Sequence, residues 1–126
     1  MSVSSNDLLN ISATLLEGPD ESHLRASMGR SYYAVYHESL IVADKLQLPK
    51  PHSLDKGVHA KQIDRFRNKG KTLAKLASRL HNAKMKRFKA DYQLNESVSK
   101  AECQQHLIAC RALMTDLQNL GELNAS

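Results

Sequence analysis

The sequence predicts an all-α protein, a single domain over residues 1–126 that forms an up-and-down bundle of about five helices. Its 126 residues suit one domain with one hydrophobic core. Only five glycines and three prolines are present, too few for the many tight turns of an all-β chain. Hydrophobic residues make up 41% of the chain and charged residues 25%, which is ordinary for a globular domain.

The first two helices are separated by Gly18 and Pro19, which cannot continue a helix. We expect the first helix over about residues 6–17. Asp20 has the residue type of an N-cap, so a long second helix is expected over about residues 21–48. The apolar stripe of that helix, its expected core contact, contains Leu24, Met28, Tyr32, Val35, Val42 and Leu46.

Three more helices follow a loop. Residues 49–57 contain two prolines and a glycine, and this composition predicts the loop. The third helix is expected near residues 58–68 and the fourth near residues 72–94. The fifth begins at Ser99, because Ser99 and Glu102 have the spacing of a capping box.

Two cysteines and a histidine of the fifth helix share one face and are residue types that bind zinc. However, Cys103 and Cys110 lie about 10 Å apart along a helix axis, too far for one zinc ion to join them. We therefore interpret both as buried free thiols, and we expect no metal site and no cofactor.

The sequence also bears on the cellular compartment. Two cysteines do not make a disulfide framework. No apolar run approaches the roughly 20 residues of a membrane span, and the N-terminus lacks the basic and apolar regions of a signal peptide. We expect a cytoplasmic protein that does not bind membranes.

Positive charge is concentrated in one segment. The net charge is +5, but residues 56–89 hold twelve Lys or Arg and one acid, so the rest of the chain is acidic. Such a segment favours a polyanionic partner, here RNA, although lysines can also serve only to keep a face solvated. The candidate RNA-binding residues share one face of the fourth helix: Lys71, Lys75, Arg79, Lys86 and Lys89.

Polar residues stand on otherwise apolar faces of two helices. On the second helix, Arg30, His37 and Asp44 align along one strip, which indicates a sheltered polar site within the bundle or between two copies. The alternative is that Arg30 forms a salt bridge and His37 is a core histidine. On the fourth helix, Arg87 lies on an apolar stripe, and Asp91 follows one turn later. This arrangement indicates either a structural ion pair between the two residues or a phosphate-binding group in a cleft.

Several segments together resemble the HEPN superfamily. They are RASMGRSYYAVYHESL, His59 and Phe66 in the next helix, RFKADYQL, and a last helix ending ACRALMTDL. The match is closest to small stand-alone members with an R-x-YYA-x-(F/Y)-H helix and a later R-x-x-ADY element. The resemblance implies a helical bundle that forms a homodimer. It also implies a metal-independent endoribonuclease that acts as a toxin or defence effector, often controlled by a nucleotidyltransferase-type antitoxin or another cognate protein.

The family's catalytic signature is an Arg and a His separated by four to six residues. Arg30 and His37 have that spacing, whereas in many active members the signature lies on a later helix, where this chain keeps Arg87 without a following His. In the expected mechanism, His37 moves the proton of the RNA 2′-hydroxyl and Arg30 or Arg87 holds the phosphate. The candidate catalytic residues are Arg30, His37, Arg87, Asp91 and Tyr92.

Two alternatives to a ribonuclease stay open. One is a non-catalytic interaction module, whose basic face binds nucleic acid or an acidic partner and whose arginines form structural ion pairs. The other is a binding subunit that works beside a nucleotidyltransferase, with Tyr92 as a modification site.

Overall fold

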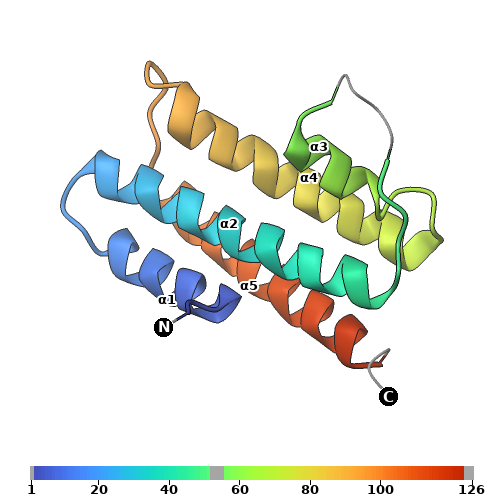
Figure 1. The fold of residues 1–126 in the computed structure, drawn as a ribbon. Helices are drawn as coiled ribbons and strands as arrows, with labels where there is room; N and C mark the ends of the chain where they lie inside the picture. Colours follow the sequence, from blue (N-terminus) through green and yellow to red (C-terminus); the bar gives the residue numbers. More distant parts are fainter. Residues whose placement is uncertain (1, 52–55, 124–126) are drawn as a thin grey trace.

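The computed structural model describes residues 2–51 and 56–123, and within these ranges it contains five α-helices and no strand. The helices are α1 (Ser5–Leu16), α2 (Glu21–Lys45), α3 (Val58–Asp64), α4 (Lys71–Tyr92) and α5 (Lys100–Leu123). Neighbouring long helices alternate in direction, so that α1 and α2, α2 and α4, and α4 and α5 run antiparallel (Figure 1). The predicted all-α bundle of about five helices is confirmed.

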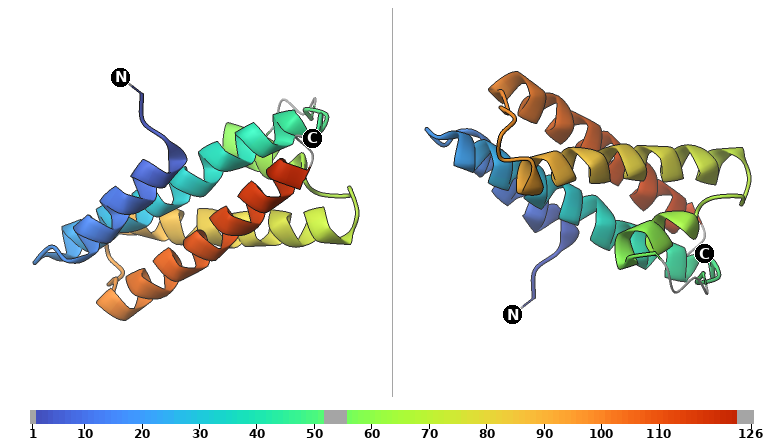
Figure 2. Two further views of the ribbon diagram at one scale, coloured as in Figure 1. Left: turned by 90° about the horizontal axis from the view of Figure 1, so that it is seen from below. Right: turned by 90° about the horizontal axis from the view of Figure 1, so that it is seen from above.

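The long helix α2 is the centre of the bundle, because it contacts each of the other four helices. Figures 1 and 2 show α1 and α5 packed on one side of α2 and α3 and α4 on the other. Its predicted apolar stripe is largely confirmed, since Met28, Tyr32, Val35 and Val42 are buried. The core around them also contains Leu9, Leu16, Ile63, Phe66, Leu76, Leu80, Leu107, Leu113, Met114 and Leu117.

Small polar side chains hold α1 close to α2. Ser12 of α1 is fully buried, and its hydroxyl donates to the Ser27 carbonyl oxygen at 2.8 Å. The Ser27 hydroxyl in turn donates to the Ser12 carbonyl oxygen at 2.7 Å, and Ser31 completes the cluster. Because these buried hydroxyls are hydrogen-bonded, the two helices can approach closely without leaving a polar group unsatisfied.

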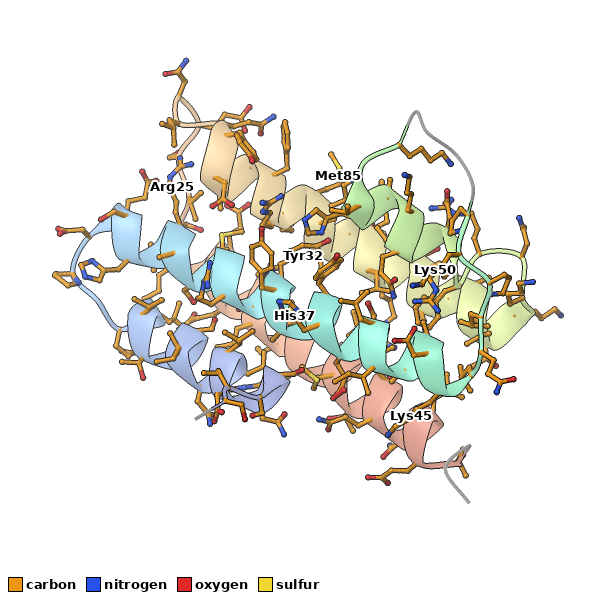
Figure 3. All side chains as sticks on the ribbon, in the orientation of Figure 1. Arg25, Tyr32, His37, Lys45, Lys50 and Met85 are labelled. Atoms are coloured by element: carbon orange, nitrogen blue, oxygen red, sulfur yellow. The ribbon has the colours of Figure 1, made fainter. Side chains whose placement is uncertain are left out.

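A buried arginine fastens the C-terminal end of α4 to α2. Arg25 is 9% exposed, and its guanidinium donates to the carbonyl oxygens of Lys89 (3.1 Å), Ala90 (2.9 Å) and Gln93 (3.3 Å), and to that of Glu96 (Figure 3). The Lys89 and Gln93 oxygens also accept backbone amides, whereas the Ala90 oxygen, in the last turn of α4, has no backbone donor among the described residues and is available to Arg25. The end of α4 is therefore fixed against α2.

Two helices end earlier than the sequence predicts. Helix α2 stops at Lys45, three residues before the predicted end, where Gln47 turns the chain with a φ of 55°. Helix α3 stops at Asp64, four residues early, where the backbone amides begin to bond three residues back: Phe66 to the Ile63 carbonyl oxygen (3.0 Å) and Arg67 to that of Asp64 (3.2 Å). In the predicted loop, residues 49–51 and 56–57 are outside helices, and residues 52–55 lie outside the described part of the chain.

The other helix boundaries agree with the predictions within two residues. Asp20 precedes α2 at the N-cap position, but its side chain makes no capping hydrogen bond. At the start of α5, the Glu102 amide donates to the Ser99 hydroxyl at 3.1 Å, which is one half of the predicted capping box. The Glu102 side chain instead binds lysines of α4. No helix in the described ranges is both long and apolar enough to cross a bilayer.

Candidate functional site

The residues predicted as catalytic meet around Tyr33 of α2. From α4, Arg87 donates through Nη2 to the Tyr33 hydroxyl at 3.0 Å, and its guanidinium carbon lies 5.3 Å from the ring centroid. The guanidinium carbon of Arg30, one turn before Tyr33, is also 5.3 Å from that centroid. The His37 ring lies one turn after Tyr33, with 6.1 Å between the centroids. Two cationic side chains and a histidine thus surround one tyrosine.

Arg87 is mostly buried, with 14% of its side chain exposed, as its place on an apolar stripe predicts. Its Nε lies 2.9 Å from Asp91 Oδ2, the distance of an ion pair, yet the N–H is not directed at that oxygen and has no hydrogen-bond partner in the described part of the chain. The Tyr92 ring lies 5.6 Å from the guanidinium. Because the Nε atom is itself buried, an anion such as phosphate would bind the part of the guanidinium that stays exposed.

A close approach of the two helices makes this arrangement possible. Gly29 of α2 faces Asp91 of α4, and a Cβ at this glycine would lie 3.7 Å from Asp91 Oδ1. That separation is an ordinary van der Waals contact for one carbon, so a longer side chain would push Asp91 away from Arg87. The small residue keeps the α4 carboxylate against α2.

A second histidine lies at the same site. His59 of α3 shares a 2.7 Å hydrogen bond between its Nδ1 and the hydroxyl of Tyr32. Its ring centroid is 5.8 Å from that of Tyr33 and 4.5 Å from that of Tyr36. Burial lowers the pKa of His59, and the nearby positive charge of Arg87 lowers it further, so the imidazole is held neutral. Burial also raises the pKa of Tyr32, whose hydroxyl keeps its proton.

The strip of Arg30, His37 and Asp44 is not a sheltered site within the bundle. Arg30 and His37 are exposed on α2, so His37 is not a core histidine (Figure 3). Arg30 forms no salt bridge with any residue in the described ranges. Asp44 instead pairs with the buried Arg65 at 3.0 Å. The polar strip is therefore a surface of the single chain, and only its first two members belong to the site.

The basic face of α4 is partly neutralised by α5. Lys86 and Lys89 both bind Glu102, at 3.4 Å and 2.9 Å, and Arg79 binds Asp116 at 2.6 Å. The lysines hold the pKa of Glu102 below its usual value through these hydrogen bonds, so this carboxylate stays charged. Lys71 and Lys75 are exposed and have no ion pair among the described residues. Three of the five predicted RNA-binding residues thus already have an acidic partner.

The cysteines of α5 are buried thiols, as predicted. Burial raises the pKa of Cys110 to about 12, so this thiol stays protonated. His106 lies between them, and its Nε2 is 3.1 Å from the Met28 carbonyl oxygen. Over residues 2–51 and 56–123, no group of three or more His, Cys, Asp or Glu side chains is arranged to hold a metal ion.

The aromatic part of the site was not predicted from the sequence. Tyr32 was expected in the core stripe, and no role was expected for Tyr33 and Tyr36. Tyr33 is three residues after Arg30 and four before His37, the spacing at which helical side chains touch. That spacing was the available signal, whereas the contact with α3 depends on tertiary structure.

Searches of protein-family models, of curated proteins and of solved structures found no match to this chain. The resemblance to the HEPN superfamily therefore stays a prediction from the motifs.

Proposed function

We propose that this chain is a HEPN-type ribonuclease that cleaves single-stranded RNA without a metal ion, and that it acts as a toxin or defence effector in the cytoplasm. The observation that supports this most is the convergence of Arg30, His37 and Arg87 around Tyr33, at a place where His37 is exposed. Our proposed partners are RNA, a second copy of the chain, and a nucleotidyltransferase-type antitoxin or another cognate protein.

The proposed chemistry uses the nucleophile that RNA carries. His37 takes the proton of a 2′-hydroxyl, the oxygen attacks the adjacent phosphorus, and the bond to the 5′-oxygen of the next nucleotide breaks. The leaving oxygen takes up a proton from water, and the products carry a 2′,3′-cyclic phosphate and a 5′-hydroxyl. Arg87, with Arg30 beside it, stabilises the negative charge that grows on the phosphate oxygens.

Incubation with single-stranded RNA in EDTA tests this proposal. We expect cleavage by the unchanged chain and a loss of about 100-fold or more in His37→Ala, since a positioned acid or base contributes about 10²–10⁴-fold. His81→Ala, at an exposed histidine of α4, is the matched control and should cleave normally. Intact RNA with a folded unchanged chain, or equal cleavage by His37→Ala, would contradict the proposal.

An apolar stripe beside Arg87 supports the proposed homodimer. Met85, Phe88 and Tyr92 of α4 are 49%, 42% and 61% exposed, and the rings of Phe88 and Tyr92 lie 5.1 Å apart. Exposed apolar side chains gathered on one face are typical of interaction surfaces. Sedimentation of Phe88→Glu should show a monomer, whereas Ile108→Glu, at an exposed residue of α5, should leave a dimer intact. A monomeric unchanged chain would exclude this part of the proposal.

One observation favours the non-catalytic module as a second candidate. Arg87 lies within ion-pair distance of Asp91, so this arginine can serve structure as well as phosphate binding. Under this alternative, Arg87→Gln lowers the melting temperature and removes no activity, because RNA is bound but never cut. The corresponding role suggested for Arg30 has no support, since Arg30 has no acidic partner among the described residues.

A further inference from the structure

A hollow between α2 and α3 opens directly beside the site. It has a volume of about 240 Å³, and its lining is mainly apolar, with Tyr36 and Leu40 from α2 and Val58 from α3. Lys61 of α3 and Lys50, which follows α2, also line it (Figure 3 labels Lys50). The size and lining suit a flat apolar group that carries negative charge at its edge.

Tyr36 joins this hollow to the residues around Tyr33. Its ring centroid lies 4.5 Å from that of His59 and 5.3 Å from that of His37, and the same side chain lines the hollow. A ligand in the hollow would therefore touch the side chain next to the proposed proton carrier. The half-buried ring is also held in place by Tyr32, whose centroid is 6.1 Å away in a stacked arrangement.

Charge together with the contact to Tyr36 distinguishes this hollow from four others that adjoin α2 or α4. Two of those four hold a cation without an ion pair among the described residues, Lys84 or Lys75, but Tyr36 lines neither of them. Neither Lys50 nor Lys61 has an ion pair within the described ranges. The hollow between α4 and α5 is lined by Arg79 and Lys86, and α5 acids already bind both. The hollow between α1 and α2 has no Lys or Arg in its lining, which includes the acid Glu38.

We infer that the hollow between α2 and α3 is a nucleotide subsite, where an unpaired base of single-stranded RNA stacks on Tyr36 and flanking phosphates bind Lys50 and Lys61. This inference rests on the proposed function, because it places the nucleotide beside the phosphate at Arg87. Stacking on an aromatic ring and a positive rim are how single strands are commonly bound. Within the described ranges α5 makes no contact with α3, so the exposed cations Lys100 and Arg111 of α5 lie away from this hollow.

Binding can be measured apart from cleavage with a short single-stranded oligonucleotide whose riboses are 2′-O-methylated, which removes the nucleophile. We expect the double variant Lys50→Gln/Lys61→Gln to bind at least tenfold more weakly in moderate salt. The slope of log affinity against log salt should fall by about 1.4, because each phosphate contact contributes about 0.7. The matched control is Lys100→Gln/Arg111→Gln, which removes the same charge from two exposed positions of α5. An equal or larger loss in this control would overturn the inference.

Substitutions of Tyr36 test whether a nucleotide base stacks on its ring. We expect Tyr36→Leu to weaken oligonucleotide binding about tenfold and Tyr36→Phe to bind normally, since a phenyl ring also stacks. An oligonucleotide without bases should bind the unchanged chain and Tyr36→Leu equally. Equal binding of the normal oligonucleotide by both chains, or tighter binding of hexaglutamate than of the oligonucleotide, would overturn the inference. These results do not depend on cleavage, so failure of His37→Ala to abolish cleavage would contradict the proposed function alone.

Discussion

The two sides of α4 carry cations in opposite situations. On the side toward α5, Lys86 and Lys89 share the carboxylate of Glu102, and this group is largely satisfied by its own chain. On the side toward α2, Arg87 faces tyrosine rings and has one nearby carboxylate, that of Asp91, with an Nε–H that no acceptor takes. Lys86 and Arg87 are neighbours in the sequence, yet Lys86 pairs with an acid of α5 whereas Arg87 is mostly buried against the tyrosine rings of α2.

A cluster of positive charge in the sequence is therefore not by itself evidence of a binding surface. Exposed ion pairs contribute only about 0–1 kcal/mol, so RNA can displace them, but each displacement costs part of the energy of binding. The mostly buried Arg87 is different, because its surroundings hold it in place before a phosphate arrives. We therefore expect large effects on the α2 side and small ones on the α5 side.

The largest effect is expected at Arg87 itself. Arg87→Gln should lower RNA cleavage by about 100-fold or more, since removal of one donor to a developing oxyanion costs about 10²–10³-fold. Lys86→Gln, the adjacent residue on the α5 side, should change cleavage less than threefold. Initial rates at saturating RNA, with melting temperatures to confirm folding, measure both. Similar losses in the two variants would remove the distinction between the two sides.

The second effect concerns the fold that supports the α2 side. Arg25→Leu should lower the free energy of unfolding by about 2–4 kcal/mol, because it removes a guanidinium that binds several carbonyl oxygens at the end of α4 and leaves that of Ala90 without a donor. Arg79→Leu breaks an exposed pair on the α5 side and should cost less than about 1 kcal/mol. Urea unfolding followed by circular dichroism measures both changes. Equal losses would show that Arg25 does not anchor α4.

The third effect is a loss of stability in acid. Burial lowers the pKa of His106 and of His59 in the folded chain, while histidine in an unfolded chain titrates near pH 6.5. Below that pH the unfolded state binds more protons than the folded state, so stability is present above about pH 6.5 and is lost as the pH falls. The effect should be smaller than that of Arg25→Leu.

His106→Gln should flatten this dependence, since a glutamine amide can still donate to the Met28 carbonyl oxygen and does not titrate. His81→Gln, at an exposed histidine, is the matched control and should leave the profile unchanged. Melting temperatures between pH 5 and pH 8 test the pair. A profile as steep in His106→Gln as in the unchanged chain would assign the acid sensitivity to other groups.

Helix periodicity and punctuation predict much of the fold, because the apolar stripe of α2 and the breaks at Gly18, Pro19 and the proline-rich loop are local features. The early ends of α2 and α3 were missed, since they lie at a left-handed Gln47 and at a change in backbone hydrogen bonding after Asp64, and neither Gln nor Asp is a strong helix breaker. The buried role of Arg25 was missed because its acceptors lie more than 60 residues away in the sequence.

The site was predicted residue by residue but not as a geometry. Arg30, His37 and Arg87 could be chosen from their unusual positions on separate helices, whereas their meeting at Tyr33 depends on the packing of α2 against α4. The ion pairs between α5 acids and the basic face could also not be predicted from the sequence, because Glu102 and Asp116 lie 13 to 37 residues from their partners. Charge counting could therefore find the cations but not tell which of them are free.

The smallest effect tests the paired side directly. Glu102→Gln removes the carboxylate that Lys86 and Lys89 share, and both lysines then gain the freedom to follow a phosphate backbone. We expect the affinity for a 2′-O-methylated oligonucleotide to rise about two- to fivefold, with a steeper salt dependence. Glu122→Gln makes the same change of net charge at an exposed residue of α5 that has no ion pair among the described residues, and it should have less effect. If the affinity rises equally in both variants, the gain comes from net charge. If the affinity rises in neither variant, RNA does not reach this face of α4, and the free cations on the α2 side bind it.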